Sequence, residues 1–137
     1  MTAQPEPLSD EVFLAQFEDK TLDPVHLNHL GHLRLAWLYL LHSPFDEALK
    51  RISQGIKAYA ESLGATQKFH VTVTEVIVKI MAQRIAAMPE KNWTLFIRNN
   101  PDLLEDMESV LLQYYSKVVL FSDVAKTRFV APDIQPI

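Results

Sequence analysis

Apolar residues recur along most of the chain at alternating spacings of three and four, the period of an α-helix with one buried face. The pattern is clearest after Ser43 and Pro44, a pair that is typical of a helix start. Gly64 then marks the end of this helix. Its apolar stripe consists of Phe45, Leu49, Ile52, Ile56, Tyr59 and Leu63.

Start and stop signals predict two helices before this one. Ser9 is a good N-cap, and the acidic residues that follow it favour a helix that ends near Glu18. Asp23 with Pro24 predicts a second helix that runs to about His42, because the missing N–H of proline costs nothing at the first helical position. The second helix is apolar over most of its length, which indicates a central, buried position.

The segment 69–80, FHVTVTEVIVKI, is compatible with two secondary structures. Its first half is β-branched and alternates as a strand would. Its second half fits a helical face, it is long for a strand, and no partner strand is predicted elsewhere. We therefore expect a helix that Pro89 stops. The face consists of Val73, Val76, Ile77, Ile80, Ile85 and Met88.

The last third of the chain contains three further helix starts. Asn92 caps a short helix, Asn100 with Pro101 starts a long one, and Ser122 starts a final short one. The long helix would bury Leu104, Met107, Val110, Leu111, Tyr114 and Val118. From Val130 onwards, prolines predict an extended tail on the surface.

These elements predict an all-α fold, a single-domain compact bundle of five to seven helices. Hydrophobic residues make up 48% of the 137 residues and only 3 are glycine, which is typical of a well-packed globular chain. Two prolines, Pro5 and Pro7, indicate a frayed leader over residues 1–8. The helical domain is expected to cover residues 9–137.

Charge and composition exclude several classes of function. A net charge of −4 provides no general attraction to phosphate backbones, so no nucleic-acid partner is expected. No stretch approaches the roughly 20 apolar residues of a membrane span, so no membrane association is expected. The absence of cysteine excludes disulfides, thiolate zinc sites and a cysteine nucleophile. With no signal peptide at the N-terminus, a cytoplasmic location follows by elimination.

The second helix carries the most informative polar residues, His29 and His32. Side chains three positions apart on a helix can face the same neighbour. A buried imidazole needs a hydrogen-bond partner or a metal, because an unpaired polar group in a core is costly. The pair therefore predicts either satisfied core or surface histidines, a polar pocket for a small molecule, or two ligands of a metal site.

His70 is the natural third member of such a site, with Thr72 and Thr74 beside it. On a helix, His70 and Thr74 share a face. Should that face meet His29 and His32, the cluster could bind an anion, position a proton or coordinate a divalent ion. Tyr115 is a further candidate hydrogen-bonding group, although tyrosines commonly pack their ring and bond their hydroxyl. The alternative is that the threonines cap the helix and that His70 is exposed.

Three functional hypotheses follow. The leading one is a protein that binds or transforms a small polar molecule in a pocket containing His29, His32 and His70. The second is a non-catalytic interaction module that forms a homodimer through the apolar stripe of the helix after Pro44. The third is a metal-dependent enzyme with the same three histidines as ligands. No known phosphate loop, nucleophile elbow or metal motif is present, and no particular cofactor is indicated.

Three stretches of the chain resemble a family of uncharacterised bacterial proteins of similar length, a domain of unknown function. They are NHLGHLRLAWLYL, with the pattern HxxHLRLAW, then FHVTVT, with the pattern FHxTxT, and the C-terminal LQYYSKVVLFSDVAKTRFVAPDIQPI with its YYS step and Pro-Asp tail. The resemblance runs from about Phe13 to the last residue. It implies that His29, His32, His70, Thr72 and Thr74 belong to one site, and it supplies no reaction.

One position departs from the pattern of that family. Its members often have an acidic residue after the third histidine, where this chain has Val71. If that acid binds a metal or moves a proton in those relatives, this protein does without it or uses Glu75.

Overall fold

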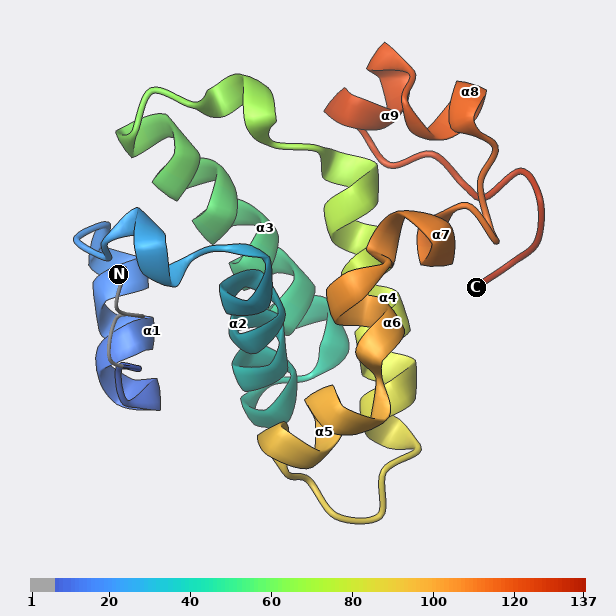
Figure 1. Ribbon diagram of the computed structural model, residues 1–137. Helices are drawn as coiled ribbons and strands as arrows, with labels where there is room; N and C mark the ends of the chain where they lie inside the picture. Colours follow the sequence, from blue (N-terminus) through green and yellow to red (C-terminus); the bar gives the residue numbers. More distant parts are fainter. Residues whose placement is uncertain (1–6) are drawn as a thin grey trace, which may run out of the picture.

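A computed structural model describes residues 7–137 of the chain (Figure 1). Over these residues the fold is all-α, as predicted, with nine α-helices and no strand. The α-helices are α1 (Asp10–Asp19), α2 (His29–His42), α3 (Phe45–Ser62), α4 (Val71–Ala86), α5 (Trp93–Asn99), α6 (Pro101–Glu105), α7 (Met107–Leu111), α8 (Lys117–Leu120) and α9 (Asp123–Thr127). Two 3-10 helices, η1 (Pro24–His26) and η2 (Thr66–Lys68), precede α2 and α4.

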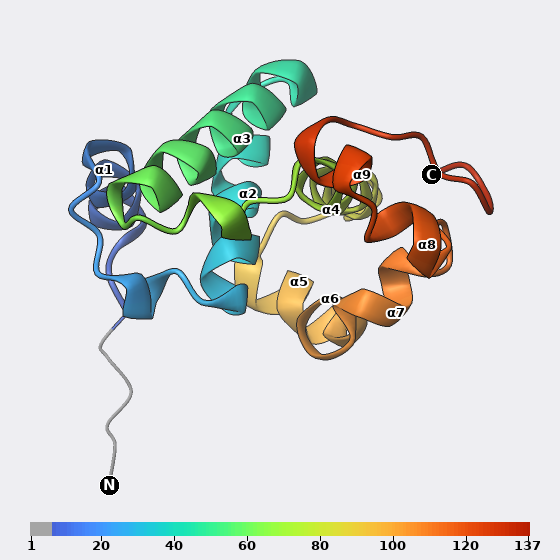
Figure 2. The ribbon, with the colours of Figure 1, turned by 90° about the horizontal axis from the view of Figure 1, so that it is seen from above.

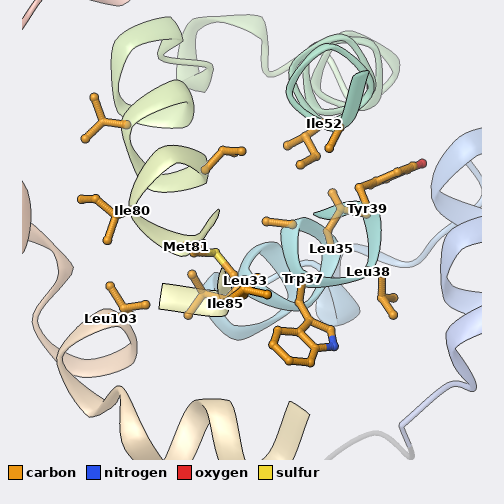
Figure 3. Packing of buried hydrophobic residues seen from close by; sticks show 14 of the residues in the cluster. Leu33, Leu35, Trp37, Leu38, Tyr39, Ile52, Ile80, Met81, Ile85 and Leu103 are labelled. Carbon is orange, nitrogen blue, oxygen red and sulfur yellow. The ribbon is translucent and has the colours of Figure 1, made fainter. Parts of the chain in front are cut away.

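Helix α2 lies at the centre of the molecule, as its apolar sequence predicts. It contacts α3, α4 and α6, and α1 lies against α3 on the other side (Figures 1 and 2). Side chains from α2, α3, α4 and α6 meet in the core drawn in Figure 3, among them Leu33, Ile52, Met81 and Leu103. The helices therefore form layers around α2. Helices α7 and α9 lie against α4, α5 packs on α2 and α6, and α8 lies beside α9.

The apolar stripe of α3 is used largely inside the protein. Ile52 and Tyr59 are buried, and Leu49 and Ile56 are partly buried against the core. Leu63, at the end of the stripe, is 51% exposed. The feature that favoured the interaction module is therefore explained mostly by packing within one chain.

The N-terminal leader falls partly outside the described residues, since these begin at Pro7. Leu8 packs against the core, and its carbonyl accepts a hydrogen bond from Arg34 at 2.6 Å. Arg34 also pairs with Asp10 at 2.7 Å and lies over the ring of Phe13. Leu8, which the prediction placed in the leader, is therefore held against α2.

The prediction that the second helix begins at Pro24 is wrong. Pro24 starts only the turn η1, and α2 begins five positions later with Asn28 as its N-cap, whose side chain accepts from the Gly31 N–H at 2.9 Å. The carbonyl of His26 lies so close to Gly31 that a Cβ there would be 2.1 Å from the oxygen. The chain therefore turns tightly between η1 and α2, and this turn interrupts the predicted helix.

Residues 71–86 form the helix that the second half of the ambiguous segment predicts. His70 is its N-cap, because the ring Nδ1 accepts the N–H of Val73 at 3.1 Å. Val76 and Ile80 of the predicted helical face are buried, as expected, whereas Val73 and Thr74 of the strand-like first half are only partly buried.

The long helix predicted from Pro101 is also wrong, because three short helices occupy that segment. Asp106 has φ −146° and ψ 43°, which ends α6, and α7 ends at Leu111. The N–H of Ser116 donates to Asp133 at 2.8 Å, and the carbonyl of Tyr114 accepts from the Ile134 N–H. The extended tail thus takes backbone groups that a continuous helix would use. Of the nine helices in residues 7–137, five have seven or more residues, and the others are the short helices of this last third.

Across residues 7–137, no helix combines the length and apolar composition needed to cross a lipid bilayer.

Candidate functional site

A cavity of about 180 Å³ lies between α2, α3 and α4, beside the connection that carries η2. Four of the predicted site residues line it: His29 and His32 from α2, and His70 and Thr74 at the start of α4. Much of the remaining wall is aliphatic, with Ile52, Ile56, Val73, Ile77 and Val78 facing the space. We call this space the histidine cavity. The structure therefore brings imidazoles from two separate parts of the chain to one place.

The backbone fixes the tautomer of each imidazole. His29 Nε2 lies 2.7 Å from the Leu103 carbonyl, His32 Nδ1 lies 2.9 Å from the Asn28 carbonyl, and His70 Nε2 lies 2.9 Å from the Leu120 carbonyl. A carbonyl oxygen only accepts, so each of these ring nitrogens carries the hydrogen and donates it. The second nitrogen of each neutral ring is consequently an acceptor.

The three remaining nitrogens differ in what they can do. His70 Nδ1 already accepts the N–H of Val73, so both nitrogens of that ring serve the fold. His29 Nδ1 and His32 Nε2 have no hydrogen-bond partner among residues 7–137. Within the same residues, no buried side-chain nitrogen or oxygen lacks a partner, so solvent reaches Nε2 of the half-buried His32. His32 therefore offers a free lone pair at the cavity.

An ion pair helps to position the partner of His29. Arg84 of α4 binds Asp102 of α6 through two hydrogen bonds of 2.7 and 2.8 Å. The bond to Arg84 holds the pKa of Asp102 below its ordinary value. Because α6 is tied to α4 in this way, the carbonyl of Leu103 is held beside α2, where His29 reaches it.

Burial lowers the pKa of His32 below its ordinary value of 6.5. The neighbouring His29 acts in the same direction, while the hydrogen bond to Asn28 opposes both. Desolvation disfavours the charged imidazolium, so His32 is neutral at neutral pH.

Protonation of His32 is expected to destabilise the protein below pH 6.5. With the folded-state pKa below the unfolded value of 6.5, the unfolded chain binds more protons in the interval between them. The free energy of unfolding therefore falls as the pH drops through that interval. Urea titrations at about pH 7.5 and about pH 5.5 measure it. The variant His32→Gln should show a smaller fall, and an equal fall would contradict the assignment.

Sequence reasoning missed Lys68 at this site. A second cavity of about 260 Å³ adjoins the first, and both are lined by His32, Ile56, Lys68 and Phe69. No carboxylate lines either cavity, and Lys68 forms no ion pair with the carboxylates of residues 7–137. A lysine in a polar connection looks like an ordinary surface residue, so only its place directly before Phe69 and His70 pointed to the site.

Thr72 and Tyr115 have other partners and are absent from the wall of the histidine cavity. The Thr72 hydroxyl donates to the Arg128 carbonyl at 2.9 Å and accepts from the Val130 N–H at 3.1 Å. The Tyr115 hydroxyl donates to the Val130 carbonyl, and burial raises its pKa to about 12. Both side chains are fully buried and fasten the C-terminal tail to α4 and the segment after α7.

Replacing Thr72 with valine is expected to lower the free energy of unfolding by about 1–3 kcal/mol. The isosteric methyl group leaves the Arg128 carbonyl and the Val130 N–H without their partner. Chemical denaturation measures the change. Thr94→Val, at an exposed position of α5, is the control and should stay within about 0.5 kcal/mol. Equal stabilities of the two variants would contradict the fastening role.

The three histidines do not assemble into a metal centre. Within residues 7–137, no three His, Asp or Glu side chains are arranged so that they could hold a metal ion. Each imidazole already donates one N–H to a carbonyl, and His70 uses its second nitrogen as a helix cap. The geometry fits a hydrogen-bonding pocket rather than a coordination site.

Comparisons of the chain with known protein families, with curated proteins and with solved structures found no match. Membership of the family suggested by the three sequence stretches stays a prediction.

Proposed function

We propose that the protein binds, and through His32 can transform, a small and largely apolar molecule in the histidine cavity. The observation that carries the proposal is the meeting of His29, His32 and His70 above an aliphatic wall. Ligand sites generally combine such a wall with a few converging polar groups. A neutral imidazole with a free lone pair is also the usual general base of enzymes, and His32 is the group that would act so.

The size of the space limits the ligand. The histidine cavity has a volume of about 180 Å³ and the adjoining one about 260 Å³. An aliphatic cavity of about 150 Å³ holds a benzene molecule. The expected ligand is therefore the size of one aromatic ring or a short branched chain, with room for a substituent that extends past Phe69.

Apolar side chains that are only partly buried in the cavity wall also support the binding of an apolar ligand. Ile56, Val73 and Ile77 line the cavity and are only partly buried, although they belong to the packed layers of α3 and α4. A ligand that covers this surface removes apolar area from water, which favours binding.

The test is a titration of the protein with a set of one-ring and short-chain compounds, followed by two-dimensional NMR. Chemical-shift changes are expected around Val73, His32 and Ile77, because these line the cavity. The variant Val73→Phe places a ring inside the space and should abolish binding. The control Val118→Phe changes a residue that is 85% exposed on α8 and should bind as the unchanged protein does.

Two results would contradict the proposal. One is that shift changes map to a surface away from α2, α3 and α4. The other is that Val73→Phe, shown to be folded by its spectrum, binds every compound as well as Val118→Phe does.

A further inference from the structure

We infer that the ligand of the histidine cavity is a small apolar alcohol or phenol, whose hydroxyl donates its proton to His32 Nε2 and accepts a hydrogen bond from Lys68. This inference rests on the proposed function and adds the chemical class of the ligand. Its basis is the pairing of one free acceptor with one free donor at the junction of the two cavities.

The acceptor is defined by the backbone. His32 Nδ1 donates to the Asn28 carbonyl, so Nε2 of the neutral ring carries a lone pair and no hydrogen. Thr74 adds acceptor capacity, because its hydroxyl hydrogen is used on the His70 carbonyl at 2.7 Å. The polar side of the cavity therefore offers acceptors, and it favours a ligand that carries a hydrogen-bond donor.

The donor is Lys68, whose ammonium group can only donate. Lys68, which is exposed, and His32 each line both cavities, so a ligand at the junction lies between these two residues. A hydroxyl is one of the few groups that donate and accept at a single atom. It satisfies His32 and Lys68 together, while the apolar body lies against Val73 and Ile77.

Other chemical classes fit less well. An ionised carboxylate has only acceptors, so it cannot donate to His32 Nε2, and its lone pairs would repel that of the nitrogen. An ammonium ion would meet Lys68 with no carboxylate in either wall to balance it. A hydrocarbon would remove water from His32 and leave its lone pair unpaired, which is unfavourable.

A matched series of one-ring compounds tests the inference: phenol, toluene, anisole, benzoate and benzylamine, each titrated by NMR at neutral pH. Phenol is expected to bind roughly tenfold more tightly than toluene or anisole, because one hydrogen bond to a desolvated acceptor distinguishes them. Benzoate and benzylamine are expected to bind more weakly than phenol.

Variants assign the effect to the two residues. His32→Leu removes the acceptor and should lower phenol affinity roughly tenfold without lowering that of toluene. His32→Gln restores an acceptor oxygen and should recover part of the affinity. His42→Leu is the control, since His42 is exposed on the same helix and lines neither cavity. Lys68→Met should also weaken phenol and leave toluene unchanged.

Lowering the pH is expected to weaken phenol binding, as His32→Leu does. The charged or titratable groups that line the two cavities with His32 are His29, Tyr59, Lys68 and His70, and none is a carboxylate. Once His32 is protonated, Nε2 gains a hydrogen and no longer accepts. Phenol affinity is expected to fall as the pH is lowered below 6.5, while toluene affinity changes less.

The outcomes separate this inference from the proposed function. If benzoate binds most tightly, or if toluene equals phenol and His32→Leu changes neither, the hydroxyl assignment is overturned while ligand binding in the cavity stands. If no compound in the series perturbs the cavity residues, both are overturned.

Discussion

Replacing Phe96 with alanine is expected to lower the free energy of unfolding by about 3–5 kcal/mol. Phe96 of α5 is fully buried, with its ring centroid 5.0 Å from that of Trp37 and 6.2 Å from that of Trp93. Removing the ring leaves a cavity among large, stiff side chains that cannot close around it. Since small domains are stable by only about 5–15 kcal/mol, the loss is a large fraction of the total.

Chemical denaturation with fluorescence detection measures this loss, because both tryptophans of the chain lie beside Phe96. The native emission of the variant should also change. Phe121→Ala is the matched control, since that ring is 56% exposed, and it should cost less than about 1 kcal/mol. A loss as small as that in Phe96→Ala would mean that α5 does not pack as described.

Gly31→Ala is expected to cost about 3 kcal/mol or more, the opposite of the usual effect of this change in a helix. Alanine within a helix is ordinarily more stable than glycine by about 1 kcal/mol. Here the new Cβ would lie 2.1 Å from the His26 carbonyl oxygen, so η1 has to move away from α2. That movement would also disturb Asn28, which caps α2 and accepts from His32.

Comparison with Gly64→Ala distinguishes the steric clash expected at Gly31 from the cost of backbone strain alone. Gly64 has φ +69°, and a Cβ there meets nothing within 4 Å. The expected cost is only about 1 kcal/mol, from the left-handed backbone alone. Thermal or urea unfolding of the two variants gives the comparison. If Gly31→Ala is as stable as the unchanged protein, the close approach of the His26 carbonyl to Gly31 is wrong.

Helices were predictable wherever a local signal is strong. Side-chain caps at Ser9, Asn92 and Ser122 start helices as expected, because capping depends on neighbouring residues only. The breaks that were missed have no such simple cap signal. A tight turn that brings the His26 carbonyl against Gly31 separates η1 from α2, and Asp133 binds the N–H of Ser116 at the start of α8 from 17 residues further on.

The same distinction explains the candidate site. His29, His32 and Thr74 could be selected because helical spacing places them on defined faces, and the packing of α2 against α4 brings those faces together. Thr72 lies only two positions from His70, yet its side chain bonds to the tail. Neither that partner nor the role of Lys68 is encoded in local spacing.

The hydrogen bond from His70 to Leu120 has a consequence for the order in which the molecule matures. His70, near the middle of the chain, binds a carbonyl of α8 that lies 50 residues further on. The hydrogen bonds of Thr72 likewise require Arg128 and Val130. Contacts between such distant residues form slowly, because a long loop has to close first. A nascent chain that has not yet reached α8 lacks the carbonyl that His70 binds, so the proposed binding of a ligand would require the C-terminal third of the chain.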